Sequence, residues 1–173
     1  GRHWVDNALA VLATVKAAGG DIAEAALALA GLSDLPGRGA RRTIAVGGGT
    51  ATLIDESYNA NPASMAAALA VLRDTPARRR VAVLGTMREL GAAGEALHAG
   101  LAAPIADAGV TALALVGPEM AALQVDGAVH LPDAAAATDW ARATLKDGDV
   151  LLVKGSNSIQ LGRLVAALQE AGR

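Results

Sequence analysis

The stretch RVAVLG, residues 80–85, holds four consecutive apolar residues and is closed by a glycine. This pattern is typical of a strand that is buried on both faces of a parallel sheet. It recurs in TALALVG at 111–117 and in DVLLVKG at 149–155. Helix-like segments of about 10–15 residues separate the three runs. The alternation predicts a Rossmann-like, doubly wound α/β fold, with a mainly parallel sheet and helices on both faces.

Shorter elements complete the predicted domain. Residues 43–46 and 51–54 flank the triple glycine 47–49, which predicts a β-hairpin. Because these glycines do not open a helix, they are not a dinucleotide-binding fingerprint. Pro62 after Asn61 predicts a capped helix start. Further helices are expected at about 93–107, from 118, at about 133–145 and at about 159–171, with a weak strand at 129–131.

The first part of the chain predicts two helices that precede this domain. Apolar residues recur at helical spacing over 3–18, and a glycine pair follows. Asp21 can cap a second, alanine-rich helix. The segment SDLPGRGARR, residues 33–42, is rich in Pro, Gly and Arg, which favours a domain boundary. We therefore expect one domain over residues 1–35 and another over 36–173.

The composition excludes several classes of protein. The 173 residues carry a net charge of −2 and only 2% aromatic residues, which argues against a nucleic-acid partner. The absence of cysteine excludes disulfides, zinc–thiolate sites, iron–sulfur clusters and a cysteine nucleophile. The sequence has no charge-free run of about 18 apolar residues, the length that a membrane span needs. We expect a cytoplasmic protein with no membrane partner.

The most informative loop is DESYNANP, residues 55–62, which follows the second strand of the hairpin. Ligands of open α/β sheets bind at the carboxyl ends of strands, and this loop carries more polar groups than a turn needs. Asp55 and Glu56 are candidates to accept hydrogen bonds from ribose hydroxyls. Asn59 and Asn61 are candidates to bind a polar ligand. For Asn61 the alternative is the cap of the following helix.

Two further loops follow buried strands. KGSNS, residues 154–158, joins a strand to an expected helix start, where backbone N–H groups and the charge of Lys154 favour an anion site. The alternative there is a plain helix cap. GTMRELG, residues 85–91, is a third candidate loop at a strand end, for which the alternative is a solvated loop with a helix cap. His98 in the next helix is interpreted as a structural residue. The P-loop pattern GxxxxGK[ST] does not occur in the sequence.

Five motifs together resemble the Mur ligase family, in the branch that adds D-alanyl-D-alanine to UDP-N-acetylmuramoyl-tripeptide. They occur in the family's order: GRHWVDNALA at 1–10, PGR at 36–38, DESYNANP at 55–62, VLGTMRELG at 83–91 with a later His, and DVLLVKGS at 149–156. The YNANP core is the most specific of them. The resemblance implies that residues 1–35 are the last helices of a central ATPase domain and that 36–173 form the C-terminal domain.

The resemblance also implies two sides of a site. Nucleotide contacts are implied for Asn7, Arg38, Asp55, Glu56, Tyr58 and Asn59, with the ribose held by either acid. Substrate contacts are implied for Asn59, Asn61, Lys154, Gly155 and Ser156. Trp4 departs from the family's Asn at that position and is interpreted as a tolerated packing change.

The reaction implied by the family has two steps. ATP phosphorylates the terminal carboxylate of the tripeptide, and the amine of D-alanyl-D-alanine then attacks the acyl phosphate, with Mg²⁺ offsetting the phosphate charge. The family's P-loop and most of its magnesium ligands belong to the central domain. Because the chain begins at Gly1 without them, we expect a piece of a monomeric ligase of peptidoglycan precursor synthesis. We expect it to be inactive alone, with no catalytic residue or metal ligand of its own.

Two alternatives stay open from the sequence. One is a sibling Mur ligase that adds a diamino acid or glutamate, or a folylpolyglutamate synthase. Those siblings carry a DYAHTP-like or DGAHNP-like loop where this chain has DESYNANP. The other alternative is a non-catalytic α/β nucleotide-binding module, which would be self-contained and would begin without partial helices.

Overall fold

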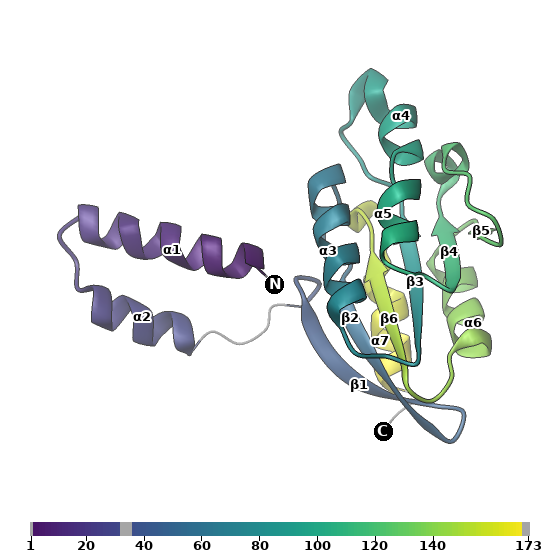
Figure 1. Cartoon of the computed structure of the whole chain (residues 1–173), viewed down its shortest axis with the longest axis horizontal. Helices are drawn as coiled ribbons and strands as arrows, with labels where there is room; N and C mark the ends of the chain where they lie inside the picture. Colours follow the sequence, from purple (N-terminus) through teal and green to yellow (C-terminus); the bar gives the residue numbers. More distant parts are fainter. Residues whose placement is uncertain (1, 32–35, 171–173) are drawn as a thin grey trace. The chain divides into compact units, whose positions relative to one another are not determined.

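The structure of the chain is a computed structural model that describes residues 2–31 and 36–170. The chain divides into two compact units, residues 1–34 and 35–173. In the first unit, α1 (Arg2–Ala17) and α2 (Ile22–Ala30) pack against each other as a helix pair (Figure 1). Asp21 caps α2, because its side chain accepts hydrogen bonds from two backbone N–H groups of the first turn. The assignment of this unit to a central ATPase domain stays a prediction.

The second unit contains a six-stranded sheet with the order β1-β2-β6-β3-β4-β5. The predicted hairpin is formed by β1 (Ala40–Val46) and β2 (Gly49–Glu56), which are antiparallel. The other strands, all paired in parallel, are β3 (Arg79–Gly85), β4 (Ala112–Val116), β5 (Val129–Leu131) and β6 (Asp149–Lys154). Although β6 is the last strand in the sequence, it lies between β2 and β3, so all its residues are buried.

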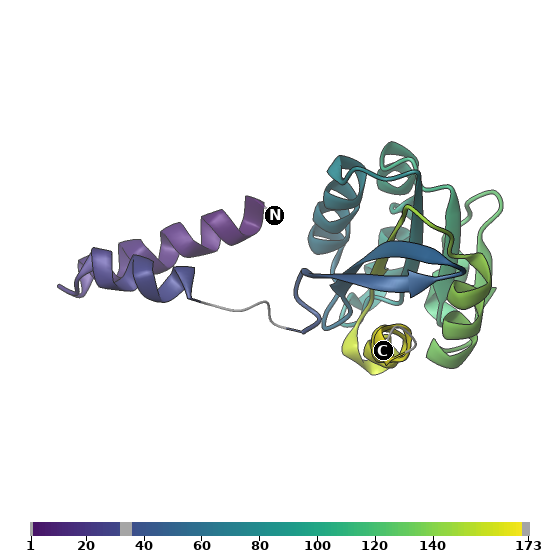
Figure 2. The ribbon, with the colours of Figure 1, turned by 90° about the horizontal axis from the view of Figure 1, so that it is seen from below.

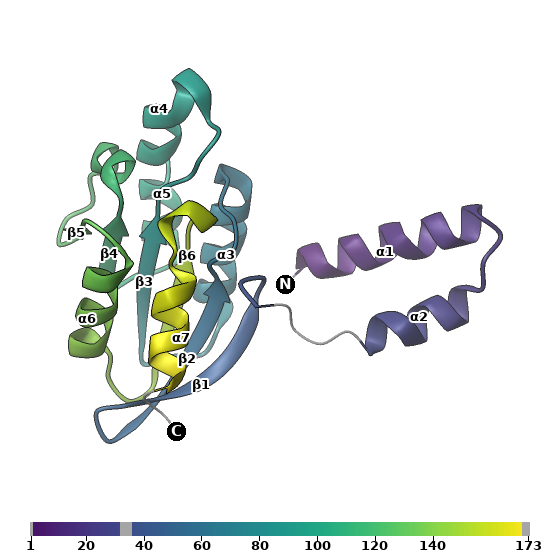
Figure 3. The same cartoon turned by 180° about the vertical axis from the view of Figure 1, so that it is seen from behind.

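Helices cover both faces of the sheet, as the doubly wound fold requires. One face carries α3 (Pro62–Asp74) and α5 (Ala102–Asp107), and the other carries α6 (Ala134–Thr144) and α7 (Gly162–Glu170) (Figures 1 and 3). The hairpin lies between these helix layers (Figure 2). Successive residues of β6 enter opposite cores: Leu152 packs on the α3 side, and Leu151 and Val153 pack on the α7 side.

The expected helix over residues 93–107 is split in two. A short turn, η1 (Gly91–Ala93), leads into α4 (Gly94–Ala99), which ends at Gly100 before α5 begins. Pro104 accounts for part of this break, because it has no N–H to donate to the carbonyl of Gly100. The expected short helix from residue 118 is the 3-10 helix η2 (Pro118–Ala122).

The last helix also begins later than predicted. The chain leaves β6 through a 3-10 turn, η3 (Asn157–Ile159), and Gln160 then adopts a left-handed φ of 59°. A left-handed residue interrupts a right-handed helix, so α7 starts only at Gly162. Among residues 2–31 and 36–170, none of the helices has the length and apolar character that crossing a membrane requires.

Candidate functional site

The carboxyl ends of β2, β6 and β3 are neighbours in the sheet and bring together the three loops marked by the sequence. Lys154 Nζ donates a hydrogen bond to the carbonyl oxygen of Asn59 at 2.8 Å. Ser156 N donates to the carbonyl oxygen of Thr86 at 3.0 Å. KGSNS is therefore hydrogen-bonded to DESYNANP on one side and to GTMRELG on the other.

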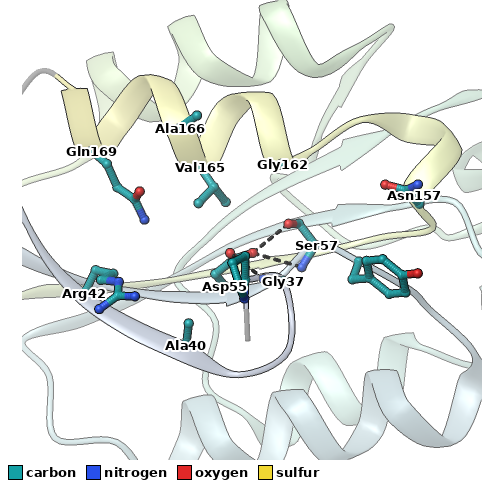
Figure 4. A pocket seen from close by; sticks show the side chains of 12 residues that line it. Gly37, Ala40, Arg42, Asp55, Ser57, Asn157, Gly162, Val165, Ala166 and Gln169 are labelled. Atoms are coloured by element: carbon teal, nitrogen blue, oxygen red, sulfur yellow. Dashed lines mark hydrogen bonds between the residues drawn. The ribbon is translucent and has the colours of Figure 1, made fainter. Parts of the chain in front are cut away.

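Asp55 is a buried residue that holds the first loop together. Its Oδ2 accepts a hydrogen bond from Gly37 N at 2.8 Å (Figure 4). Its Oδ1 accepts from Ser57 Oγ at 2.6 Å and from Ser57 N at 3.1 Å. Only 5% of Asp55 is exposed. Both carboxylate oxygens are thus already used to join the segment around Gly37 to the end of β2.

The PGR segment, residues 36–38, packs against Tyr58. The backbone N–H of Tyr58 donates to the carbonyl oxygen of Gly37 at 3.2 Å. Gly37 has a φ of +75°, and a Cβ there would lie 2.8 Å from Tyr58 Cβ, so the position requires glycine. The Arg38 guanidinium lies 4.3 Å from the centroid of the Tyr58 ring, a cation–π contact. Two predicted nucleotide contacts, Arg38 and Tyr58, therefore form one exposed stack.

A pocket of about 320 Å³ opens beside this stack, between the end of β2 and α7 (Figure 4). Its lining residues are Pro36, Gly37, Ala40, Arg42, Asp55, Ser57, Tyr58, Asn157, Gly162, Val165, Ala166 and Gln169. The acid in this pocket is Asp55, whose oxygens already accept hydrogen bonds. The pocket therefore offers a recess next to the stack, without an unengaged carboxylate.

Glu56 and Lys154 form an ion pair on the face of the sheet covered by α3. They are register partners on β2 and β6, and Lys154 Nζ lies 3.6 Å from Glu56 Oε2. Lys154 is 2% exposed. Burial lowers the pKa of Lys154 below its ordinary value, and the charge of Glu56 partly offsets this effect. The Glu56 side chain keeps 17% exposure, so this acid, unlike Asp55, retains acceptor capacity toward solvent.

The geometry of KGSNS differs from that of the expected anion site. Lys154 Nζ and Ser156 N already donate to carbonyl oxygens, and Ser156 Oγ accepts from Arg88 N at 2.9 Å. The helix that begins directly after Ser156 is the short 3-10 turn η3, and the α-helix α7 starts only at Gly162. A Cβ on Gly155 would lie 3.0 Å from Gly85 Cα, so this glycine lets β6 pass close to β3. The three KGS residues fix the neighbouring loops, and their substrate contacts stay predictions.

Glu119 lies at the same end of the sheet as these loops, and it belongs to none of the sequence motifs. Its carboxylate pairs with the Arg88 guanidinium and accepts from Thr86 Oγ1 at 3.0 Å. A hydrogen bond from its own backbone N–H, together with these partners, holds the pKa of Glu119 below its ordinary value. Arg88 Nε also donates to Ser158 Oγ at 3.3 Å. Glu119 follows the carboxyl end of β4. The rule that ligands bind at the carboxyl ends of strands therefore also selects the loop that contains Glu119.

His98 is buried and structural, as expected. Its Nε2 accepts a hydrogen bond from Met87 N at 3.0 Å, which assigns the ring proton to Nδ1. Nδ1 then donates to the carbonyl oxygen of Gly94 at 2.7 Å. Nε2 thus holds the GTMRELG loop against α4, and Nδ1 fixes the ring within α4.

The sequence that forms these loops matches a known protein family. The family description "Mur ligase, glutamate ligase domain" matches residues 41–157, which is most of the second unit. The chain belongs to the Mur ligase family. The match covers the hairpin, the Lys154–Glu56 pair and the loops at the carboxyl ends of β2, β3 and β6.

Curated relatives extend this likeness over nearly the whole Mur ligase chain. It is 36% identical over 176 residues to the UDP-N-acetylmuramoyl-tripeptide–D-alanyl-D-alanine ligase of Escherichia coli K12, covering 99% of this chain and 38% of that protein. The enzyme of the same name from Synechocystis is 34% identical, covering 97% of this chain and 37% of the relative. The chain thus spans well under half of the length of these relatives.

Solved structures agree with the fold of this Mur ligase chain. The crystal structure of MurF from Acinetobacter baumannii has a TM-score of 0.79 and 28% identity, covering 98% of this chain and 38% of that one. The MurF ligase of Thermotoga maritima, crystallised with ADP, has a TM-score of 0.75 and 24% identity, covering 92% of this chain and 36% of that one. The two leading helices are included in the Acinetobacter match, which confirms the predicted fold class.

Three asparagines of the Mur ligase motifs have different surroundings. Asn61 caps α3: its Oδ1 accepts from Ser64 N at 2.8 Å, and Ser64 Oγ accepts from Asn61 N at 3.0 Å. Asn59 is exposed, and its Oδ1 accepts from Ala60 N at 2.8 Å. Asn7 is exposed on α1 in the first unit. The contacts of Asn7 with adenine, and of Asn59 and Asn61 with substrate, stay predictions.

The cap formed by Asn61 gives a test of this part of the Mur ligase site. Asn61→Ala is expected to lower the free energy of unfolding of the chain by about 1 kcal/mol, because the first turn of α3 loses its side-chain acceptor. Chemical denaturation measures the change. Asn61→Ser is the control. Because serine also caps helices, this variant should lose much less unfolding free energy. Equal losses in the two variants would contradict the capping role.

The described residues contain no cluster of metal-binding side chains. Among residues 2–31 and 36–170, no group of three or more His, Cys, Asp or Glu side chains is placed to hold a metal ion. Asp55 has both oxygens engaged, and Glu56 is paired with Lys154. We therefore assign no magnesium ligand within the described part of this Mur ligase chain.

Proposed function

We propose that this chain is the C-terminal part of an ATP-dependent ligase that adds D-alanyl-D-alanine to UDP-N-acetylmuramoyl-tripeptide. The observation that carries the proposal is the position of DESYNANP at the carboxyl end of β2, hydrogen-bonded to both PGR and KGS. The names of the curated relatives support the same reaction. The complete enzyme would act as a monomer in the bacterial cytoplasm, in peptidoglycan precursor synthesis.

On the nucleotide side, Glu56 is the acid that binds the ribose. Asp55 accepts three hydrogen bonds from Gly37 and Ser57, so it has little capacity left for a ligand. Among the described residues Glu56 pairs with Lys154, and its side chain remains partly exposed. The exposed stack of Arg38 on Tyr58, which follows Glu56 by two residues in the sequence, adds a cation and an aromatic surface to the same loop. The Thermotoga maritima relative was crystallised with ADP, which supports a nucleotide site in this fold.

On the dipeptide side, the Asn59 side chain is the best-placed polar group. Its carbonyl oxygen is held by Lys154 at 2.8 Å, which fixes the backbone while the side-chain amide stays exposed. Asn61 uses its side-chain oxygen in the helix cap. Asn59 Nδ2 is therefore free to donate to the peptide or carboxylate oxygens of the incoming dipeptide.

The reaction is tested with the complete ligase. The purified enzyme is given ATP, Mg²⁺ and UDP-N-acetylmuramoyl-tripeptide with either D-alanyl-D-alanine or D-glutamate, and phosphate release is measured. We expect turnover only with the dipeptide. Turnover with the single amino acid would favour a sibling ligase instead. An enzyme inactive with both acceptors would contradict the proposed reaction.

The role of Asn59 is tested in the same assay. Asn59→Ala is expected to raise the KM for D-alanyl-D-alanine by about fivefold to tenfold, the effect of losing one hydrogen bond of about 1 kcal/mol. Gln124→Ala removes another exposed amide, which lies beyond η2, and should leave this KM unchanged. An unchanged KM in Asn59→Ala would remove Asn59 from the dipeptide site.

A further inference from the structure

Lys154 is a buried cation that the sequence places among substrate contacts, yet its neighbours come from the chain itself. It ends β6, the strand between β2 and β3, and is 2% exposed. Burial of an ammonium group is costly unless it is paired and hydrogen-bonded. Glu56 Oε2 at 3.6 Å supplies the opposite charge, and the carbonyl oxygen of Asn59 at 2.8 Å supplies the hydrogen bond.

These two contacts join residues that belong to different sides of the proposed site. Glu56 is the proposed ribose acid, and Asn59 is the proposed dipeptide contact. They lie at the two ends of the four-residue segment 56–59, which also carries the Tyr58 ring. One ammonium group therefore touches both ends of the segment on which the nucleotide side and the dipeptide side meet.

The two contacts act on different parts of these residues. At Glu56, Lys154 holds the side chain, whose remaining acceptor capacity is exposed. At Asn59, it holds the backbone carbonyl, while the exposed side chain, whose Oδ1 accepts from Ala60 N, presents its Nδ2 to a ligand. In each case the lysine fixes the position of a residue while leaving that residue's ligand-facing group available.

We propose that Lys154 is a positioning residue that sets the nucleotide side and the dipeptide side of the site together, without contacting either substrate. This inference rests on the proposed function. In this proposal a single group positions the residues that bind both substrates. Loss of the ammonium group would release the Glu56 carboxylate and the Asn59 carbonyl together. Both substrates should then bind more weakly at once.

The test uses Lys154→Met in the complete ligase, because methionine fills much of the same buried volume without the charge. We expect the KM for ATP and the KM for D-alanyl-D-alanine each to rise by about tenfold, the order expected when a hydrogen bond to a charged group is lost. Lys146→Met is the matched control. Lys146 is exposed and precedes β6 at the opposite end of the strand, so both constants should stay at the wild-type values.

Two results would overturn the proposal. A rise in the dipeptide KM alone would make Lys154 a direct substrate contact. A lower melting temperature with both constants unchanged would make it a purely structural residue. If Lys154→Met does not fold, Lys154→Arg keeps the charge but moves the donor atoms, and it should shift both constants in the same direction. A shift of only one constant, or of neither, would contradict the proposal in that variant too.

Failure of the inference can be told apart from failure of the proposed function. The wild-type enzyme is assayed first, and its choice of acceptor tests the function alone. If it uses another amino acid in place of D-alanyl-D-alanine, that acceptor takes the dipeptide's place in the same comparison of Lys154→Met with Lys146→Met. A joint rise of both constants then still supports the positioning role.

Discussion

Replacing Arg79 with methionine is expected to lower the free energy of unfolding of the chain by about 1–3 kcal/mol, the cost of leaving a buried acceptor without its partner, since Asp149 is buried whereas the Arg79 side chain is 32% exposed. Arg79 donates from Nε to Asp149 Oδ1 at 3.0 Å and from Nη2 to Asp149 Oδ2 at 2.6 Å. Asp149 is 2% exposed at the start of the central strand β6. Methionine would leave its carboxylate buried with one other donor, the backbone N–H of Lys146.

The adjacent arginine provides the matched control. Arg78 pairs with Asp147 at 3.0 Å, but their side chains are 73% and 51% exposed. Exposed ion pairs contribute little to stability, so Arg78→Met should unfold at nearly the same urea concentration as the wild type. Urea denaturation followed by circular dichroism measures both variants. If the two arginine variants lost the same stability, the buried pair would not be the source of the effect.

The Arg79–Asp149 pair also predicts how stability depends on pH. Burial opposes ionisation of Asp149, but hydrogen bonds from Arg79 and the Lys146 N–H outweigh it and hold the pKa of Asp149 below its ordinary value. A carboxyl whose pKa is lowered by folding contributes its full stability above its unfolded pKa, about 3.9. The contribution is lost as the pH falls through the folded pKa. The stability difference between wild type and Arg79→Met should therefore shrink as the pH is lowered below about 4.

The strands of this chain can be predicted from the sequence because their signal is local. Consecutive apolar residues before a glycine identify β3 and β4, and the same run before Lys154 identifies β6. The order of the strands is not local, because β6 is inserted between β2 and β3 by tertiary packing. The break between α4 and α5 was missed because alanine-rich residues around Gly100 have helical composition, whereas Pro104 removes the bond that would continue the helix.

The candidate site can be predicted in its location but not in its contacts. The rule that ligands bind at the carboxyl ends of strands selects the three loops that the fold brings together. The partner of each polar group depends on residues far away in the chain. Asp55 Oδ2 accepts from Gly37, 18 positions earlier, and Lys154 is bound to Asn59 across 95 positions. Residue type alone does not tell whether a donor or acceptor is already used, and so the sequence left Asp55 and Glu56 as equal candidates.

The choice between these two acids gives the second large expected effect. In the complete ligase, 3′-deoxy-ATP or 2′-deoxy-ATP should have a KM about tenfold or more above that of ATP, because a hydrogen bond from a ribose hydroxyl to a carboxylate is lost. In Glu56→Gln the ratio of the deoxynucleotide KM to the ATP KM should fall toward one, since the charged acceptor is absent for both nucleotides. In Asp55→Asn the ratio should keep its wild-type value, because Asp55 already serves Gly37 and Ser57.

The ratio of the KM for the deoxynucleotide to the KM for ATP reports on ribose binding and does not depend on how much of the enzyme is folded. This separation matters because both substitutions affect stability. An amide at position 55 would place an NH₂ group against the N–H of either Gly37 or Ser57, whichever way it is turned. Asp55→Asn should therefore lose about 1.5–3 kcal/mol of unfolding free energy while its preference for ATP over the deoxynucleotide persists. The reverse pattern, with the preference lost in Asp55→Asn and kept in Glu56→Gln, would assign the ribose to Asp55. It would also require the carboxylate of Asp55 to give up its bonds to Gly37 and Ser57 when nucleotide binds.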